Sequence, residues 1–228
     1  GRLHRYNLSA GEVGEVSLLE QEFSAYVGSK FCLAVASGGY ALACALRAME
    51  VKPGDRVLTN AFTLAPVPGA IASIGAVPVF VGVTEGLVID LADLEVKAGQ
   101  ADVLMLSHMR GHIVDMEKLA DVVKACNLTL IEDCAHTMGA KWSGTRSGNF
   151  GLAGCFSTQT YKHMNSGEGG LITTNDAEFM ARCIMMSGSY MLYERHGAAP
   201  DPDVFKKIRL QTPNQSGRMD NLRAAILR

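Results

Sequence analysis

Short apolar runs alternate along this chain with segments of helical periodicity, and this alternation restricts the fold more than any other feature. Continuous apolar runs of four to six residues are typical of strands buried on both faces of a sheet. Strands that alternate with helices form a mostly parallel sheet with helices on both faces. We therefore predict a three-layer α/β sandwich around a mostly parallel central sheet. The predicted strands lie at residues 31–36, 56–59, 77–81, 102–106, 128–131, 156–157 and 171–174.

Helices are predicted between these runs. In the first, Val16, Leu19 and Phe23 recur at the spacing of one helix face. Asp115 directly precedes another and is a favoured N-cap residue type. The stretch 190–213 is rich in proline and charge, so we expect an exposed excursion there. The predicted helices span residues 12–27, 38–49, 67–74, 116–125 and 176–186.

The composition argues against several classes of function. The 228 residues are 48% hydrophobic and 19% charged, which suits one large globular α/β domain. A formal net charge of -2 argues against nucleic acid or an anionic membrane as a partner. No apolar run is long enough for a membrane span. The six cysteines are scattered, which favours a reduced, cytoplasmic protein without disulfides or a zinc site.

Small residues follow the first predicted strand, at Ser37, Gly38 and Gly39, where a helix begins. Free amides at a helix start bind phosphate, and glycines let the anion approach the backbone. The alternative is a serine N-cap followed by glycines that ease a tight turn. Both interpretations are open from the residues alone.

Lys162 lies in a glycine-rich turn between two apolar strands, an unusual place for a solubilising charge. Asp133 and Ser157 end other strands, and ligands gather at the carboxyl ends of parallel strands. Pyridoxal phosphate chemistry needs a lysine that forms an imine and an aspartate that holds the ring nitrogen. The alternatives are a surface lysine, a carboxylate that caps a loop and a serine satisfied within its strand.

His108 and His112 are four residues apart, a spacing that would align two metal ligands on a helix. Gly111 and the preceding apolar run predict a strand that leads into a loop instead. We therefore expect no metal site here.

Taken together, these segments resemble the DegT/DnrJ family of sugar and cyclitol aminotransferases, among the fold-type I pyridoxal phosphate enzymes. The resemblance covers nearly the whole chain. For example, Glu-Asp-Cys-Ala-His at 132–136 is similar to the family's Glu-Asp-Ala-Ala/Cys-Gln/His segment. The other matching segments lie at residues 31–47, 53–81, 107–116, 155–162, 167–176 and 214–220.

The resemblance implies roles for individual residues. Lys162 would form the Schiff base with pyridoxal 5'-phosphate and later move a proton. Asp133 would bond the pyridinium nitrogen, and His136 would lie near the ring and its phenolic oxygen. Phosphate would be held by the amides of Gly38 and Gly39 and by the hydroxyl of Ser157.

Three positions depart from the family pattern. Gly39 replaces a threonine of the phosphate turn, so one hydroxyl is missing. Leu64 stands at the position that we align with the ring-stacking aromatic, and Phe62 is the alternative for that place. Asn214, or Ser216, would supply the contact that each subunit of a homodimer lends to its partner's site.

The resemblance further implies a domain division. Residues 1–30 would form an N-terminal helical segment, and 31–189 the large domain that binds pyridoxal phosphate. Residues 190–228 would form the exposed excursion and the start of a helix. That helix would lead to a small C-terminal domain, which we expect beyond Arg228 and outside this chain.

The implied function is transfer of an amino group from glutamate or glutamine to a keto-sugar nucleotide or a cyclitol ketone. A dehydratase-like reaction on the same cofactor is one alternative. Relatives that dehydrate sugars carry histidine at the lysine position, so Lys162 argues against it. A non-catalytic binding or regulatory relative is the other alternative, and Gly39 and Leu64 favour it.

Overall fold

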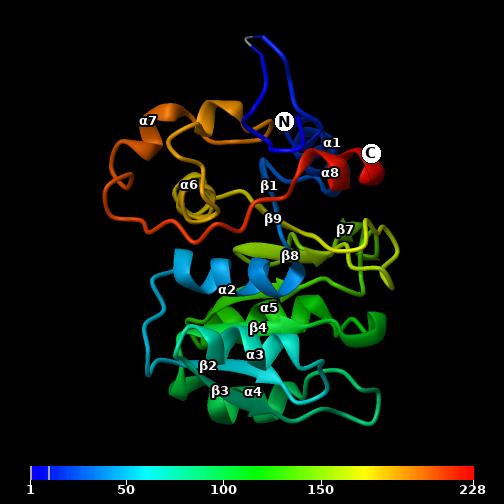
Figure 1. Ribbon diagram of the computed structural model, residues 1–228. Helices are drawn as coiled ribbons and strands as arrows, with labels where there is room; N and C mark the ends of the chain where they lie inside the picture. The colour runs from blue at the N-terminus through cyan, green and yellow to red at the C-terminus, as the bar shows by residue number, and fades with distance from the viewer. Residues whose placement is uncertain (1, 10) are drawn as a thin grey trace.

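A seven-stranded sheet forms the centre of the computed structural model, which describes residues 2–9 and 11–228 (Figure 1). The strand order is β1-β9-β8-β5-β4-β2-β3. β9 runs antiparallel to both neighbours, whereas the other adjacent strands pair in parallel. The mostly parallel sheet is thereby confirmed. The strands are β1 (Phe31–Val35), β2 (Arg56–Asn60), β3 (Val77–Val81), β4 (Val103–Ser107), β5 (Thr129–Asp133), β8 (Ala153–Ser157) and β9 (Gly170–Thr174).

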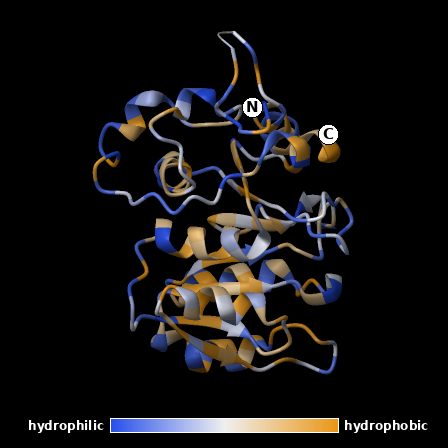
Figure 2. Cartoon of the chain, viewed as in Figure 1, coloured by the Kyte–Doolittle hydropathy of each residue, from blue (hydrophilic) through white to orange (hydrophobic). Residues whose placement is uncertain are grey.

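Helices cover both faces of this sheet, which gives the expected three layers. One face packs against α2 (Gly38–Ala48), α3 (Pro66–Ser73) and α6 (Ala177–Met186). The other face packs against α4, α5, α1 and α8. Figure 2 shows that the strands between these layers are largely hydrophobic. The bounds on this second face are α1 (Glu15–Val27), α4 (Leu91–Lys97), α5 (Met116–Ala125) and α8 (Asn221–Leu227).

The helix starts follow the capping residues. Asp115 accepts a hydrogen bond from the Lys118 amide at 3.1 Å, as its place before α5 predicts. α1 begins at Glu15, later than predicted, because the extended Gly14 is its N-cap. The remaining elements are short: β6 (Lys141–Trp142), β7 (Thr145–Arg146), η1 (Ala98–Gln100), η2 (Met109–Gly111), η3 (Tyr193–Arg195) and α7 (Pro202–Phe205).

The expectation of an exposed excursion at residues 190–213 is wrong for its central part. Phe205 and Ile208 are 0% and 1% exposed and belong to the core beside α2 and α6. Tyr193 stacks on Phe205, with ring centroids 4.1 Å apart. The apolar pair Phe205 and Ile208, three residues apart on a helical turn, anchors a segment whose overall composition is polar.

A buried polar network joins the N-terminal segment to α1 and to the loop after α6. Arg5 forms two hydrogen bonds with the Glu20 carboxylate, at 2.9 and 3.0 Å. Arg5 also donates to Nδ1 of His196 at 2.9 Å, and Nε2 of His196 lies 2.7 Å from the Tyr6 hydroxyl. All four side chains are buried. The network ties segments together that lie up to 191 residues apart.

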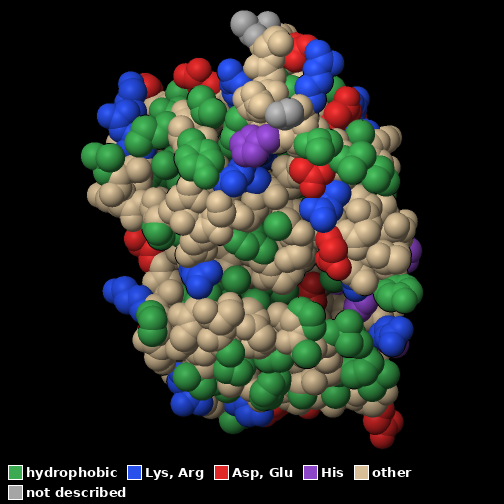
Figure 3. Space-filling view, in the orientation of Figure 1, with side chains coloured by type: hydrophobic (Ala, Val, Ile, Leu, Met, Phe, Trp, Pro, Cys, Tyr) green, Lys and Arg blue, Asp and Glu red, His purple; other side chains and the backbone are tan. Residues whose placement is uncertain are grey.

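Charged side chains of both signs are spread over the surface, as Figure 3 shows for one face. The six cysteines are free, and Cys126 is half-buried while the others are buried. Within residues 2–9 and 11–228, none of the helices is long and apolar enough to cross a membrane.

Candidate functional site

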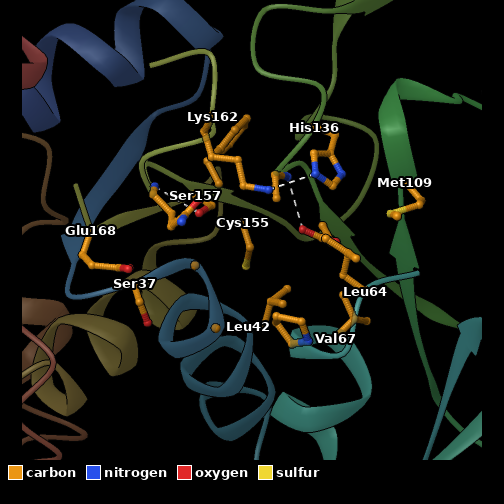
Figure 4. Close-up of a pocket in the computed structure, with 17 residues that line it drawn as sticks. Ser37, Leu42, Leu64, Val67, Met109, His136, Cys155, Ser157, Lys162 and Glu168 are labelled. Atoms are coloured by element: carbon orange, nitrogen blue, oxygen red, sulfur yellow. Dashed lines mark hydrogen bonds between the residues drawn. The ribbon is translucent and has the colours of Figure 1, made fainter. Parts of the chain in front are cut away.

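A cavity of about 450 Å³ opens beyond the carboxyl ends of β5 and β8, beside the start of α2 (Figure 4). This is the edge where parallel α/β sheets bind ligands. Asn214 lies outside its wall, as do the alternatives Phe62 and Ser216. The predicted residues that line it are Gly38, Gly39, Leu64, Asp133, His136, Ser157 and Lys162.

The start of α2 faces this cavity with backbone groups. Ser37 is its N-cap and accepts a hydrogen bond from the Tyr40 amide at 3.1 Å. The amides of Gly38 and Gly39 come before the first that can reach an acceptor within the helix, so they are free to bind an anion. A Cβ on Gly38 would lie 2.8 Å from the Cβ of Ser157, whereas a Cβ on Gly39 would meet nothing within 4 Å.

Ser157 ends β8 and lies against the start of α2. Its hydroxyl accepts only a long bond, from the Gln159 amide at 3.4 Å, so its own hydrogen is available to an anion. Ser157 pairs across the sheet with Gly170. A Cβ on Gly170 would lie 2.6 Å from the backbone of Ser37, so glycine allows the helix start to approach the sheet.

Asp133 ends β5 and is buried. The Ser107 hydroxyl donates to its Oδ2 at 2.9 Å, and the Ala135 amide donates to its Oδ1 at 3.2 Å. Ser107 occupies the paired position at the end of the parallel neighbour β4. These two bonds hold the carboxylate in a fixed orientation in the cavity wall.

The preceding residue, Glu132, has a different environment. It accepts hydrogen bonds from Nε2 of His108 at 3.0 Å and from the amides of Gly148 and Phe150 at 2.9 and 2.7 Å. His108, Glu132 and Cys134 lie close enough to resemble metal ligands. Both Glu132 oxygens already accept hydrogen bonds from the protein, which gives this cluster a structural role.

Lys162 reaches into the cavity towards His136 (Figure 4), and its Nζ lies 2.9 Å from the ring nitrogen Nε2. The other ring nitrogen, Nδ1, accepts a hydrogen bond from the Arg110 amide at 3.2 Å. Burial lowers the pKa of Lys162, the Asp133 carboxylate partly offsets this, and the Arg110 guanidinium lowers it further. Burial and the neighbouring Lys162 lower the pKa of His136.

An aliphatic surface forms the cavity wall near α2 and α3. Leu64 is 42% exposed and lies there with Leu42, Val67 and Met109. Phe62 is not part of the wall, since its ring meets the edge of His112 at a centroid distance of 6.4 Å. Of the two positions considered for ring stacking, the structure therefore places Leu64 in the cavity.

Asn214 is exposed, and its side-chain oxygen accepts a hydrogen bond from the Ser216 amide at 2.9 Å. Arg218 lies nearby, where it donates to the Gly188 carbonyl and covers the Tyr190 ring. This surface cluster is separate from the cavity wall within one chain.

Sequence reasoning missed the supporting roles of Ser107 and Arg110. The signal for Ser107 was its place at the end of the strand next to β5, where it faces Asp133 in the parallel register. Arg110 contributes through its peptide N–H, which its side-chain identity does not reveal. In the sequence, the aliphatic wall residues Leu42 and Val67 cannot be told from ordinary core positions of helices.

Comparisons with known proteins agree on one family. Residues 8–228 match the model of the DegT/DnrJ/EryC1/StrS aminotransferase family. A dTDP-3-amino-3,6-dideoxy-alpha-D-galactopyranose transaminase from Aneurinibacillus thermoaerophilus is 36% identical over 94% of this chain and 56% of its own length. A putative L-glutamine:3-amino-2,3-dideoxy-scyllo-inosose aminotransferase from Micromonospora echinospora is 36% identical over 73% of this chain and 40% of its own.

A pleiotropic regulatory protein from Geobacillus stearothermophilus is also similar, with 33% identity over 93% of this chain and 54% of that protein. Among solved structures, DesV of S. venezuelae in complex with a ketimine intermediate matches with a TM-score of 0.81 and 29% identity. That match covers 96% of this chain and 57% of DesV. The chain thus spans about half the length of these relatives.

Proposed function

Because the chain belongs to the DegT/DnrJ/EryC1/StrS aminotransferase family, we propose that its cavity binds pyridoxal 5'-phosphate for transamination. The observation that carries this proposal is the meeting of four chemical groups in one wall. These are an amine at Lys162, a carboxylate at Asp133, a hydroxyl at Ser157 and the free amides at the start of α2. When bound, the cofactor supplies an electron sink for a bond broken next to the transferred nitrogen.

The residues present fit this group. Gly38 has no space for a side chain beside Ser157, so the backbone amide itself is what the helix start offers to a phosphate. Asp133, oriented by Ser107, would bind the protonated ring nitrogen as a charge-assisted hydrogen-bond acceptor. Lys162 would hold the aldehyde carbon, and Leu64 would cover one side of the ring with aliphatic surface.

The chain's own residues have separable tasks in this proposal. Lys162 holds and moves a proton, because partial burial lowers its pKa and makes the ammonium group a readier proton donor. Asp133 would hold the ring nitrogen in its protonated form. His136 lies next to Lys162 and would approach the phenolic oxygen of the ring.

The proposed reaction moves an amino group from glutamate or glutamine to a keto-sugar nucleotide or a cyclitol ketone. The names of the relatives support these classes, since they include a dTDP-amino-sugar transaminase and a glutamine:inosose aminotransferase. We also propose that the full active site forms in a cytoplasmic homodimer. In that dimer Asn214, exposed and outside its own cavity, would reach the partner's site.

Borohydride trapping tests the proposal. The chain is mixed with pyridoxal phosphate and reduced, and the modified lysine is located by peptide mass spectrometry. We expect the cofactor mass at Lys162 and a visible absorption band that Lys162→Ala abolishes. Lys141→Ala is the matched control, because Lys141 is exposed on β6, outside the cavity wall. A label spread over surface lysines, or unaffected by Lys162→Ala, would refute cofactor binding here.

A second assay tests the reaction type. Glutamate or glutamine is added to the cofactor-loaded protein, and the keto acid is measured against the cofactor present. One keto acid per cofactor without an acceptor, and turnover with an acceptor ketone, supports transamination. Binding without keto acid would favour the regulatory alternative, and loss of an acceptor hydroxyl would favour the dehydratase-like one.

A further inference from the structure

His136 lies between a backbone N–H group and a side-chain amine. Its Nδ1 receives the Arg110 peptide N–H at 3.2 Å, and its Nε2 faces Nζ of Lys162 at 2.9 Å. Figure 4 shows Lys162 extended towards this ring. The protonation states of the three groups are therefore linked by hydrogen bonding.

A peptide N–H only donates, so Nδ1 of His136 must carry a free lone pair. The neutral ring then has its proton on Nε2, which becomes a donor towards Lys162. An ammonium group has three hydrogens and no lone pair, and it cannot accept from Nε2. A neutral amine can. Both contacts of His136 are satisfied together only when Lys162 is uncharged.

The backbone around Arg110 is built for this contact. Arg110 adopts a left-handed conformation with φ 57° and ψ 18°, and Gly111 follows with φ 83°. Such a conformation is unfavourable for a residue with a side chain and persists where the surroundings hold it. Gly111 lies close to the backbone of His136, since a Cβ added to Gly111 would be 3.5 Å from the His136 carbonyl oxygen.

Burial is the largest influence on the charge of Lys162, and it favours the neutral amine. The Arg110 guanidinium, from the loop after β4, acts in the same direction as burial but less strongly. Asp133 at the end of β5 opposes them. His163 lies close enough to disfavour a charge on His136, and Glu168 is the other acidic residue of the cavity wall.

We propose that Arg110 is a positioning residue whose peptide N–H fixes His136 as the Nε2-protonated tautomer, and that His136 thereby holds Lys162 as a neutral amine. The neutral amine has the lone pair that a carbonyl carbon accepts, so the free protein is ready for its carbonyl ligand. This inference rests on the proposed function for its purpose. Its test uses only the cofactor-free chain.

Nitrogen NMR of the histidine rings gives the first readout. We expect His136 to be neutral at pH 7 with its proton on Nε2, with the signal assigned by its loss in His136→Gln. The variant Arg110→Gly keeps the peptide N–H and suits the left-handed backbone, so the tautomer is expected to persist. An Nδ1-protonated or doubly protonated ring in the unmodified chain would overturn the proposal.

The second readout is the pH profile of Lys162 acetylation by trace acetic anhydride, measured by mass spectrometry. In His136→Gln the amide oxygen is able to accept from an ammonium group, so labelling at neutral pH is expected to fall about fivefold, the effect of one neutral hydrogen bond. Lys141 serves as the internal reference. An unchanged profile would mean that burial alone sets the state of Lys162, and would overturn the proposal.

The two proposals fail in different experiments. Absence of cofactor at Lys162 after borohydride reduction would defeat the proposed function and leave the NMR result standing. A wrong tautomer would defeat only the positioning role. If His136→Gln does not fold, the ring spectrum of the unmodified chain and of Arg110→Gly still decides.

Discussion

The two glycines that open α2 have opposite surroundings, so alanine at these neighbouring positions is expected to have opposite effects. A Cβ on Gly38 would lie 2.8 Å from the Cβ and 3.2 Å from the Oγ of Ser157, whereas a Cβ on Gly39 would meet nothing within 4 Å. Ser157 is buried at the end of β8 and is not free to move aside. Overpacking of this kind costs about 1–3 kcal/mol, and replacing a helical glycine with alanine gains up to about 1 kcal/mol.

The free energy of unfolding of Gly39→Ala is therefore expected to exceed that of Gly38→Ala by about 1–4 kcal/mol. For a chain of this size, at about 2–4 °C per kcal/mol, the difference in Tm is about 2–16 °C. Circular dichroism during heating and in urea measures it. Borohydride trapping adds the functional readout, because a displaced helix start in Gly38→Ala should weaken cofactor retention at Lys162 while Gly39→Ala retains it. Equal stabilities, or a less stable Gly39→Ala, would refute the steric argument.

Two further predictions concern buried polar groups. Burial lowers the pKa of His196 from 6.5 to about 4. Burial raises the pKa of Glu20, but Arg5 and His196 together outweigh it and lower that pKa from 4.5 to about 2. Both contributions to stability are complete above about pH 6.5, and they are lost as the pH falls, first that of His196 and then that of Glu20. Urea unfolding from pH 8 to pH 3 should show this decline, and a flat profile would contradict it. Separately, Ser107→Ala removes the donor to Oδ2 of Asp133 and should cost about 1–3 kcal/mol in urea unfolding, with weaker cofactor retention. An unchanged urea midpoint would show that solvent replaces the serine.

The sheet was predictable because most of its strands are buried on both faces, and all of them therefore stand out as short apolar runs. The strand predicted at 31–36 is observed as Phe31–Val35, and that predicted at 77–81 as Val77–Val81. The meeting of Asp133, Ser157 and Lys162 in one cavity wall followed from the rule that parallel strands share a carboxyl edge. Local periodicity and topology together were sufficient for this part.

Other features depend on contacts between distant segments and left no local signal. The Arg5 and Glu20 pair looks like two ordinary surface charges in the sequence, yet both side chains are buried. Phe205 and Ile208 lie in a polar, proline-containing stretch that predicts exposure. The contact from Arg110 to His136 uses a peptide N–H, so it is determined by backbone angles and not by residue type.

The adjacent carboxylates Glu132 and Asp133 show how one strand serves both the scaffold and the site. Successive side chains of a strand point to opposite faces, so the two residues meet different surroundings although they are neighbours. Glu132 is satisfied by His108 and by the amides of the loop at 148–151, and it fixes that loop against β5. Asp133 receives one side-chain donor and one amide, which leaves acceptor capacity for a ligand in the cavity.

The two carboxylates should therefore respond differently to replacement by an amide. Glu132→Gln would place an NH₂ group opposite donors that need an acceptor, and it should destabilise the fold. Asp133→Asn should fold but lose the affinity for a protonated ring. Unfolding midpoints and borohydride trapping, measured on both variants, separate these outcomes, and equal loss of stability in the two would contradict the division of roles.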